Sequence, residues 1–253
     1  MRLVRFIYKE NKRWGVADKS FVRVLLKSPF NKIKFSGERV PLNKVKLIAP
    51  AEATKIVLVG LNYRDHAKEL SMPIPNEPII FLKPTTSLIA HKENIVYPQG
   101  VERLDYEGEL ALVIGREGKN INEEKVKEHI LGYTCLHDVT ARCLQRRDIQ
   151  WTRAKSFDTF CPLGPWLETD INPNNLQIRT FLNGNIKQDS NTSNFIFSIN
   201  YLVSFISKIM TLLPGDIIST GTPPGVGSME IGDRVEVELE GIGKLINRVV
   251  AYK

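Results

Sequence analysis

Hydrophobic and polar positions change along this chain in short runs that predict strands. Two runs, residues 3–7 and 21–26, lie near the N-terminus, and the later ones are rich in Ile and Val and bounded by Gly, Pro or Asn. Such composition between turn residues is typical of strands. The later runs span residues 55–60, 78–82, 110–115, 216–220, 234–240 and 244–251. Gly241 to Gly243, between the last two runs, predicts a hairpin turn.

Helical patterns are few. Residues 122–130 begin with an Asn that suits a helix cap and carry acidic residues in the first turn. Residues 140–148 form a second short candidate, and residues 198–210 place six apolar side chains at helical spacing. Because long helices do not alternate with strands, the pattern disfavours a doubly wound sheet. It predicts a mostly β fold of the α+β class with a few short helices.

Length and charge suggest two parts. The 253 residues suffice for one large domain with a small appendage. Residues 1–55 carry 14 Lys or Arg and 4 Asp or Glu, a net +10, whereas residues 56–253 carry 21 and 24, a net −3. With the turn residues at 49–52, this shift predicts a small basic N-terminal domain, residues 1–52, and a larger domain, residues 53–253.

Composition limits the setting. No stretch approaches about 20 apolar residues, so no membrane-spanning helix is expected. The first residues lack the apolar core of a signal peptide. Three cysteines, none in a CxxC pair, fit reduced thiols and a cytoplasmic protein.

A cluster of carboxylates carries the first chemical signal. Asp105, Glu107 and Glu109 are spaced two apart, so on a strand they face one side. Like charges that close repel unless a cation intervenes, and hard carboxylate oxygens suit magnesium, manganese or calcium. A solvated strand face is the simpler alternative for this segment alone.

A second acidic position follows the apolar stretch 130–136. Asp138 could be a third ligand or the N-cap of the next helix, and this segment alone favours the N-cap. Arg142 and Gln145 lie four and seven residues further on, so both could face a site near that helix's N-terminus.

Two more segments complete the candidate chemistry. His66 and Glu69 are three residues apart, so one helical turn brings them together, and a carboxylate beside an imidazole raises its basicity. A surface ion pair is the simpler explanation. Residues 219–227 form a Gly- and Pro-rich loop whose N–H groups and hydroxyls could bind a carboxylate, or which is a plain turn.

Taken together, these clusters resemble the fumarylacetoacetate hydrolase superfamily. The resemblance covers about residues 55 to 250 and rests on many motifs in one order. They are found at residues 59–63, 66–69, 81–84, 105–110, 137–142, 151–159, 163–166, 213–216 and 220–227.

The resemblance implies a fold, a cofactor and an assembly. The fold would be a mixed, mostly β-sandwich roll with a small N-terminal domain. A divalent ion, Mg²⁺ with Mn²⁺ or Ca²⁺ possible, would bind Glu107, Glu109 and Asp138. A homodimer that acts on a small 2-oxo acid is expected, without a membrane partner.

The resemblance also implies roles for single residues. The catalytic group would comprise His66, Glu69, Lys155 and Gln145. Substrate contacts would come from Thr222, Arg142, Tyr63 and Lys83.

The implied reaction is hydrolysis of a 2,4-dioxo acid, such as an acylpyruvate, to pyruvate and a carboxylic acid. His66, oriented by Glu69, would take a proton from the attacking water. Lys155 and Gln145 would stabilise the oxyanion and hold the water. Isomerisation of 2-hydroxyhepta-2,4-diene-1,7-dioate and decarboxylation of oxaloacetate are alternatives on the same chemistry, although the His66–Glu69 pair slightly favours hydrolysis.

Two alternatives from other classes are kept. A non-catalytic member of the fold would have lost a carboxylate or His66, and neither is lost here. A nucleic-acid binder would interleave basic and aromatic residues. The composition of residues 1–55 is compatible with such a binder, and binding that weakens steeply with salt would support it. The aromatic residues of the basic segment are Phe6, Tyr8, Trp14, Phe21, Phe30 and Phe35.

Overall fold

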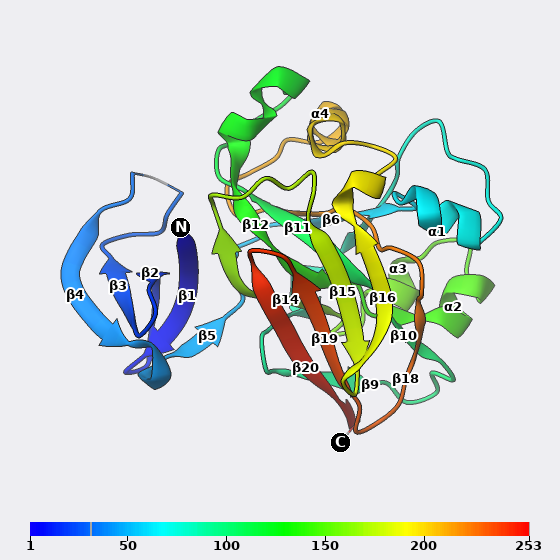
Figure 1. The fold of residues 1–253 in the computed structure, drawn as a ribbon, viewed down its shortest axis with the longest axis horizontal. Coiled ribbons are helices and arrows are strands. Elements are labelled where there is room, and N and C mark those ends of the chain that lie inside the picture. The colour runs from blue at the N-terminus through cyan, green and yellow to red at the C-terminus, as the bar shows by residue number, and fades with distance from the viewer. Residues whose placement is uncertain (31, 253) are drawn as a thin grey trace.

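The computed structural model describes residues 1–30 and 32–252 and confirms a mostly β fold (Figure 1). Within the described residues, the largest sheet has twelve strands. Its main path is β4 (Phe35–Pro41), β3 (Phe21–Leu25), β2 (Asn11–Ala17), β1 (Arg2–Tyr8), β14 (Cys161–Glu168), β12 (Ile130–His137), β11 (Gly108–Ile114), β17 (Ile217–Ser219), β6 (Ile56–Gly60) and β7 (Ile79–Lys83). Off this path, β5 (Lys46–Ile48) pairs with β1, and β8 (Leu88–Ala90) pairs with β14.

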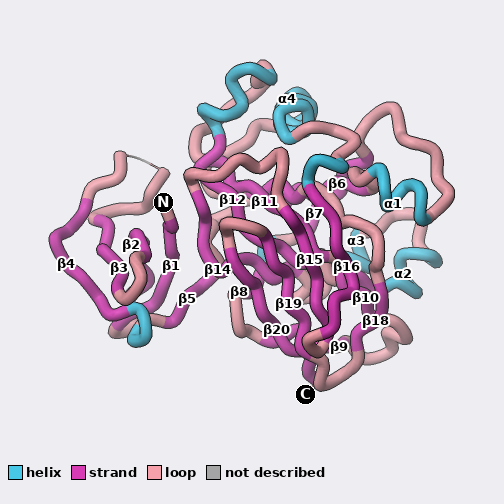
Figure 2. Tube along the Cα trace, viewed as in Figure 1, coloured by secondary structure: helices cyan, strands magenta, loops and turns pink. Residues whose placement is uncertain are grey.

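Two smaller sheets and four α-helices complete the described part of the chain. The five-stranded sheet runs β16 (Asn185–Asn191), β15 (Gln177–Leu182), β19 (Arg234–Leu239), β20 (Gly243–Ala251) and β9 (Asn94–Tyr97). The three-stranded sheet runs β13 (Thr140–Ala141), β10 (Leu104–Tyr106) and β18 (Gly227–Met229). The helices are α1 (Arg64–Glu69), α2 (Arg142–Arg147), α3 (Thr152–Lys155) and α4 (Ile199–Ile209). Figure 2 shows α1, α2 and α4 at the outside of the strands. Short 3₁₀ helices span Leu42–Lys44, Thr85–Ser87, Glu123–His129 and Thr192–Asn194.

Each of the six predicted apolar runs from residue 55 onward contains a strand, but the helix predictions need correction. Residues 122–130 contain a 3₁₀ helix, Glu123–His129, and the Asn122 side chain forms no cap. Residues 140–148 divide into β13 and α2. The third prediction is confirmed, because α4 occupies Ile199–Ile209 and the Ser198 hydroxyl accepts a hydrogen bond from the Tyr201 N–H. At 11 residues α4 is the longest α-helix described, and no described helix is long and apolar enough to cross a membrane.

The core lies on both faces of β11, which is buried along its whole length. Leu110 and Leu112 pack in one cluster with Val237 of the five-stranded sheet. Ala111 and Val113 face the other way, into a cluster with β6 and β14. This alternation follows from the two-residue period of a strand. It places Glu109 on the side of β11 away from the five-stranded sheet.

The N-terminal strands continue the large sheet. β1 pairs antiparallel with β2 and also with β14, where Leu3 lies opposite Leu167. Beneath β3 and β4 a separate small core contains Val22, Val24 and Val40. In Figure 1 this part projects to one side, with β4 furthest out. The division of the chain at residue 52 stays a prediction.

Gly108 lies between the two glutamates where the sheets approach closely. A Cβ at this position would lie 2.2 Å from Thr180 Oγ1 and 3.2 Å from Val237. Gly108→Ala should therefore destabilise the fold by about 1–3 kcal/mol through overpacking. Chemical denaturation measures the loss. Adding Thr180→Ala, which removes the crowding atom, should recover part of it; a double variant no more stable than Gly108→Ala would contradict this explanation.

Candidate metal centre and active site

Three buried carboxylates converge where two strands meet. Glu107, Glu109 and Asp138 each offer one oxygen, and these oxygens lie within 4.8 Å of one another. Backbone pairing explains the convergence, because β11 and β12 align Gly108 with His137, and the Asp138 N–H donates to the Glu107 carbonyl at 2.9 Å. The predicted grouping of these three residues is present in the structure. Asp105 is not part of it, because its oxygens bind Arg103 and Arg142.

Glu107 is held in its charged form. Burial raises the pKa of this carboxyl, but Lys155 and Arg142 outweigh burial and lower the pKa to about 2. The Lys155 Nζ lies 2.9 Å from Glu107 Oε2, and the Arg142 guanidinium donates to Oε1. Glu107 is therefore negative at neutral pH and matched by two cations.

Glu109 is in the opposite electrostatic situation. Burial raises its pKa, Asp138 repels its charge, and the pKa stands at about 8 even though Ser219 donates a hydrogen bond. The Gly221 N–H also donates to the same oxygen, Oε2, at 3.0 Å. A cation at the cluster would offset both the burial and the repulsion, and so favour the ionised form of this carboxyl.

Asp138 is bracketed by two buried lysines. Its Oδ2 accepts a hydrogen bond from Lys155 Nζ at 2.5 Å, and its Oδ1 lies 2.6 Å from Lys83 Nζ. Oδ1 nevertheless accepts no hydrogen bond of good geometry. Asp138 does not cap a helix, which was the interpretation favoured by its segment alone. The short strand β13 intervenes, and α2 begins only at Arg142, after Ala141.

These observations fit a divalent cation. The donors are all carboxylate oxygens, the preferred ligands of Mg²⁺, Mn²⁺ and Ca²⁺. The pKa of Glu109 is raised by burial and then by the like charge of Asp138, and the buried Asp138 Oδ1 accepts no hydrogen bond. Both features show that the protein's own groups compensate the charge and hydrogen-bonding capacity of these carboxylates only in part.

The histidine–carboxylate pair is also formed. His66 Nδ1 lies 2.8 Å from Glu69 Oε2 on α1, where the His66 side chain is 12% exposed and that of Glu69 is 42% exposed. The other oxygen of Glu69 accepts from the Gly225 N–H at 3.0 Å. The loop that binds Glu69 through Gly225 therefore also binds Glu109 through Gly221. One short segment thus ties α1 to the acidic cluster.

Arg142 lies among the site carboxylates rather than free in an open pocket. Its guanidinium donates to Asp105 at 2.8 Å, to Glu107 and to Gln145 Oε1. Asp105 and Glu107 raise its pKa despite burial, which keeps it charged. Arg142 and Gln145, both predicted from the sequence, therefore lie beside Glu107 as one hydrogen-bonded group.

The other predicted substrate-contact residues differ in whether their polar atoms already have hydrogen-bond partners in the protein. The Thr222 hydroxyl donates to the Gly108 carbonyl at 3.0 Å and accepts from Gln188, so both of its roles are filled. Lys83 is fully buried and also donates to the Val139 carbonyl at 3.1 Å. Tyr63 is buried with an unpartnered hydroxyl, and burial followed by the charge of Glu109 raises its pKa.

Residues that the sequence did not single out complete the support. Gln188 accepts from the Gly108 N–H at 2.9 Å and donates to Thr222 and to Pro223, each at 2.8 Å. It joins β16 to the glutamate segment and to the loop, but no local motif marks it. His137 is buried with both ring nitrogens unpartnered, and burial followed by Lys83 lowers its pKa to about 3, so it is neutral.

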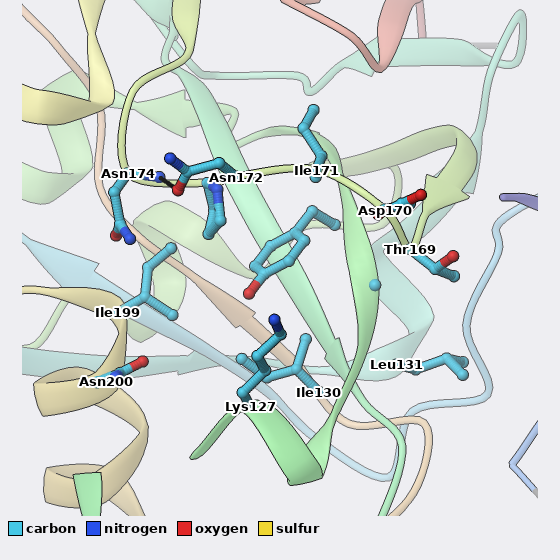
Figure 3. A pocket seen from close by; sticks show the side chains of 13 residues that line it. Lys127, Ile130, Leu131, Thr169, Asp170, Ile171, Asn172, Asn174, Ile199 and Asn200 are labelled. Carbon is cyan, nitrogen blue, oxygen red and sulfur yellow. Dashed lines mark hydrogen bonds between the residues drawn. The ribbon is translucent and has the colours of Figure 1, made fainter. Parts of the chain in front are cut away.

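A polar hollow lies elsewhere, between the start of β12 and the first turn of α4 (Figure 3). Its volume is about 520 Å³, and its charged lining residues are Lys127 and Asp170. Burial raises the pKa of Tyr133, which also lines it, to about 12, so this phenol stays protonated. None of the lining residues belongs to the acidic cluster.

Comparison with known proteins gives the class. Residues 55–250 match the family model "Fumarylacetoacetate (FAA) hydrolase C-terminal", and residues 1–50 match "Rv2993c-like, N-terminal". The chain therefore belongs to the FAA hydrolase family, as its motifs predicted. Members of this family are enzymes that include isomerases, hydrolases and tautomerases.

Similar proteins carry names from several reactions. The chain is 44% identical to the structure of 5-carboxymethyl-2-hydroxymuconate delta-isomerase from Mycobacterium smegmatis, with a TM-score of 0.95 over 100% of both chains. It is 43% identical to oxaloacetate tautomerase FAHD2A, mitochondrial, of Bos taurus, over 83% of this chain and 71% of that protein. A fumarylacetoacetate hydrolase from Exiguobacterium antarcticum is 32% identical, with a TM-score of 0.90 over 100% of both chains.

The two glutamates should respond differently to neutralisation. Glu107→Gln leaves Lys155 paired only with Asp138 and Arg142 paired only with Asp105, and should destabilise the metal-free protein by about 3 kcal/mol. Glu109→Gln resembles the protonated carboxyl that a pKa of about 8 makes the main form at neutral pH, and its amide oxygen can still accept from Ser219 and Gly221, so stability should be kept.

Denaturation in the presence of a chelator compares these variants directly. Both should lose the rise in thermal midpoint that Mg²⁺ gives the unchanged protein. Equal destabilisation by the two substitutions would show that the assigned charge states are wrong.

Proposed function

We propose that this chain is a divalent-metal-dependent hydrolase that cleaves a C–C bond of a 2,4-dioxo acid such as an acylpyruvate. Water adds to the distal carbonyl, and the bond between that carbon and C3 breaks. C3 keeps the electron pair and is protonated, which yields pyruvate and a carboxylic acid. The observation that carries this proposal is that one loop donates backbone hydrogen bonds to both glutamates, from Gly221 to Glu109 and from Gly225 to Glu69. The loop thereby joins the carboxylate cluster to the proposed base, His66.

Glu107, Glu109 and Asp138 are the proposed metal ligands, with magnesium as the proposed ion. When bound, the ion supplies Lewis-acid polarisation of the substrate carbonyl. The protein's own contribution is to hold three oxygens in place before the ion binds. Lys83 and Lys155 orient Asp138, while Ser219 and Gly221 orient Glu109.

His66 is the proposed general base. A hydrogen bond from its Nδ1–H to Glu69 leaves Nε2 free to take a proton from water, and the carboxylate stabilises the resulting imidazolium. Glu69 is in turn held by the Gly225 N–H, so the orientation of the imidazole depends on the loop. His66 is partly exposed, which allows water to reach it.

Lys155 and Gln145 are the proposed partners of the oxygen that gains negative charge. The Lys155 ammonium lies between Glu107 and Asp138, whose charges outweigh burial and raise its pKa, so it is a permanent donor at the edge of the cluster. Gln145 is oriented by Arg142, which leaves its amide N–H₂ free to hold water.

The second candidate is an isomerase or tautomerase. The names of the M. smegmatis and B. taurus relatives favour it, and the same groups would move a proton between carbon atoms without an attacking water. Decarboxylation of oxaloacetate is a third outcome of the same polarised 2-oxo acid. The reactions differ in their products, so an assay can separate them.

A substrate panel tests the proposal. The purified protein with Mg²⁺ or Mn²⁺ is offered acetylpyruvate, fumarylpyruvate, oxaloacetate and 2-hydroxyhepta-2,4-diene-1,7-dioate, and enol absorbance and pyruvate release are followed. We expect pyruvate from an acylpyruvate and complete loss of turnover after metal removal. Turnover limited to isomerisation without pyruvate would replace hydrolysis by the second candidate, and activity that survives removal of all metal would refute both.

Replacement of the proposed base gives an independent test. His66→Ala should lower kcat by about a hundredfold or more, because it removes the imidazole that is the proposed base. The Mg²⁺-dependent rise in thermal midpoint should persist, since His66 is not among the carboxylate ligands. Lys68→Gln, an exposed change on the same helix, is the control and should stay active. Full activity of His66→Ala would remove the general-base role.

A further inference from the structure

The outer surface of β3 and β4 carries two arginines and two phenylalanines in alternation. Arg23 lies directly opposite Arg39 across the two strands. The Arg23 guanidinium lies 4.5 Å from the centre of the Phe35 ring, and that of Arg39 lies 5.9 Å from the centre of the Phe21 ring. We call these four residues the Arg–Phe face. By strand register the two rings are separated by four residues, or roughly 13 Å, with the arginine pair between them.

The outward direction of this face is set by the core beneath it. Val22, Val24 and Val40 alternate with the face residues and are buried. The rings of Phe21 and Phe35 remain 38% and 42% exposed. Phe6 and Trp14, aromatic residues of the same basic segment, are buried. Two exposed aromatic rings on a strand pair that already has a core under it indicate a contact surface.

The charge of the face is uncompensated. Like charges directly opposite on neighbouring strands destabilise a sheet. Within residues 1–30 and 32–252, neither Arg23 nor Arg39 forms an ion pair. Glu38, the adjacent carboxylate on β4, pairs with Arg13 at 2.6 Å instead. Exposed lysines at positions 19 and 34 lie near the starts of the same strands. The arrangement therefore presents concentrated positive charge to an anionic partner.

We propose that the Arg–Phe face binds single-stranded nucleic acid, with phosphates at the arginine pair and bases against the two rings. Positive charge that follows a backbone, combined with aromatic rings that accept any base, is how proteins bind single strands without sequence preference. An acidic peptide would use the charge but not two separated rings. Composition alone left this possibility open. The structure adds that the two arginines and two phenylalanines lie on one face and that the arginines form no ion pair within the described residues.

The position of the face makes it independent of the metal centre. β3 and β4 lie at one end of the molecule, whereas α1 and α2 lie at the other (Figure 1). Binding there leaves the carboxylate cluster untouched. The experiment therefore needs no catalytic assay and stands whether or not hydrolysis is the reaction.

Anisotropy of a short fluorescein-labelled oligouridylate tests the proposal on the full chain. We expect binding at about 50 mM salt that weakens as salt rises, with a log–log slope of about −0.7 for each phosphate contacted. Replacing both arginines, Arg23→Gln with Arg39→Gln, should make that slope shallower by about 1.4. Phe21→Ala or Phe35→Ala should each weaken binding about tenfold while leaving the slope unchanged.

Arg248→Gln is the control for the loss of one positive charge, and it is compared with Arg23→Gln alone and with Arg39→Gln alone. Arg248 lies opposite Arg234 on β19 and β20, but the Arg234 guanidinium is neutralised by Glu236. The control removes one exposed charge and should leave binding unchanged. The arginine variants should keep the thermal midpoint of the unchanged protein, because these side chains are exposed. The phenylalanine variants should remain folded at the temperature of the binding assay, which the same measurement checks.

Three results would overturn the proposal. The first is no change in anisotropy at about 50 mM salt, since single-strand binding is stronger there than at physiological salt. The second is an equal loss of affinity in Arg248→Gln, which would show a response to net charge only. The third is undiminished binding in the phenylalanine variants with equal competition by heparin, which would show a general polyanion surface without base contacts.

Discussion

Three carboxylates buried within 4.8 Å of one another are the constraint on which this site depends. Each loses hydration on folding, and each repels the other two. Lys83, Lys155 and Arg142 are themselves buried or nearly so, and they would be costly there without these partners. The cluster and its cations thus make each other's burial possible. Glu109 is the carboxyl that these cations do not compensate, because burial and the charge of Asp138 raise its pKa to about 8.

The sheets supply the geometry that the charges require. Pairing of β11 with β12 brings residues from two distant segments to one place, and the buried faces of β11 leave little freedom to move. The loop from Ser219 to Gly225 adds a second constraint, because its ends bind Glu109 and Glu69. Disorder in this loop would therefore disturb the acidic cluster and the imidazole of His66 together.

Sequence patterns captured what depends on short spacing. The two-residue period of a strand identified Glu107 with Glu109, and one helical turn identified His66 with Glu69. The role of Asp138 remained ambiguous because an aspartate between a strand and a helix can be either a ligand at the strand end or the helix N-cap. In the structure the two residues of β13 separate Asp138 from α2, so it is not the N-cap. The pairing of Lys83 with Asp138 and the bridging role of Gln188 link residues far apart in the chain, so no local pattern could reveal either. The catalytic roles of the site residues stay predictions, because proximity alone does not establish chemistry.

The joining of β1 to β14 has a consequence for how the molecule is assembled. Leu3 lies opposite Leu167, so β1 cannot take its place beside β14 until the long stretch of chain between them has been made. Contacts of such long sequence separation close large loops and form slowly. The basic N-terminal strands must therefore remain undocked on one edge while the central sheet is being translated. The pairing of β1 with β14 is therefore expected to form after the local pairing of β1 with β2.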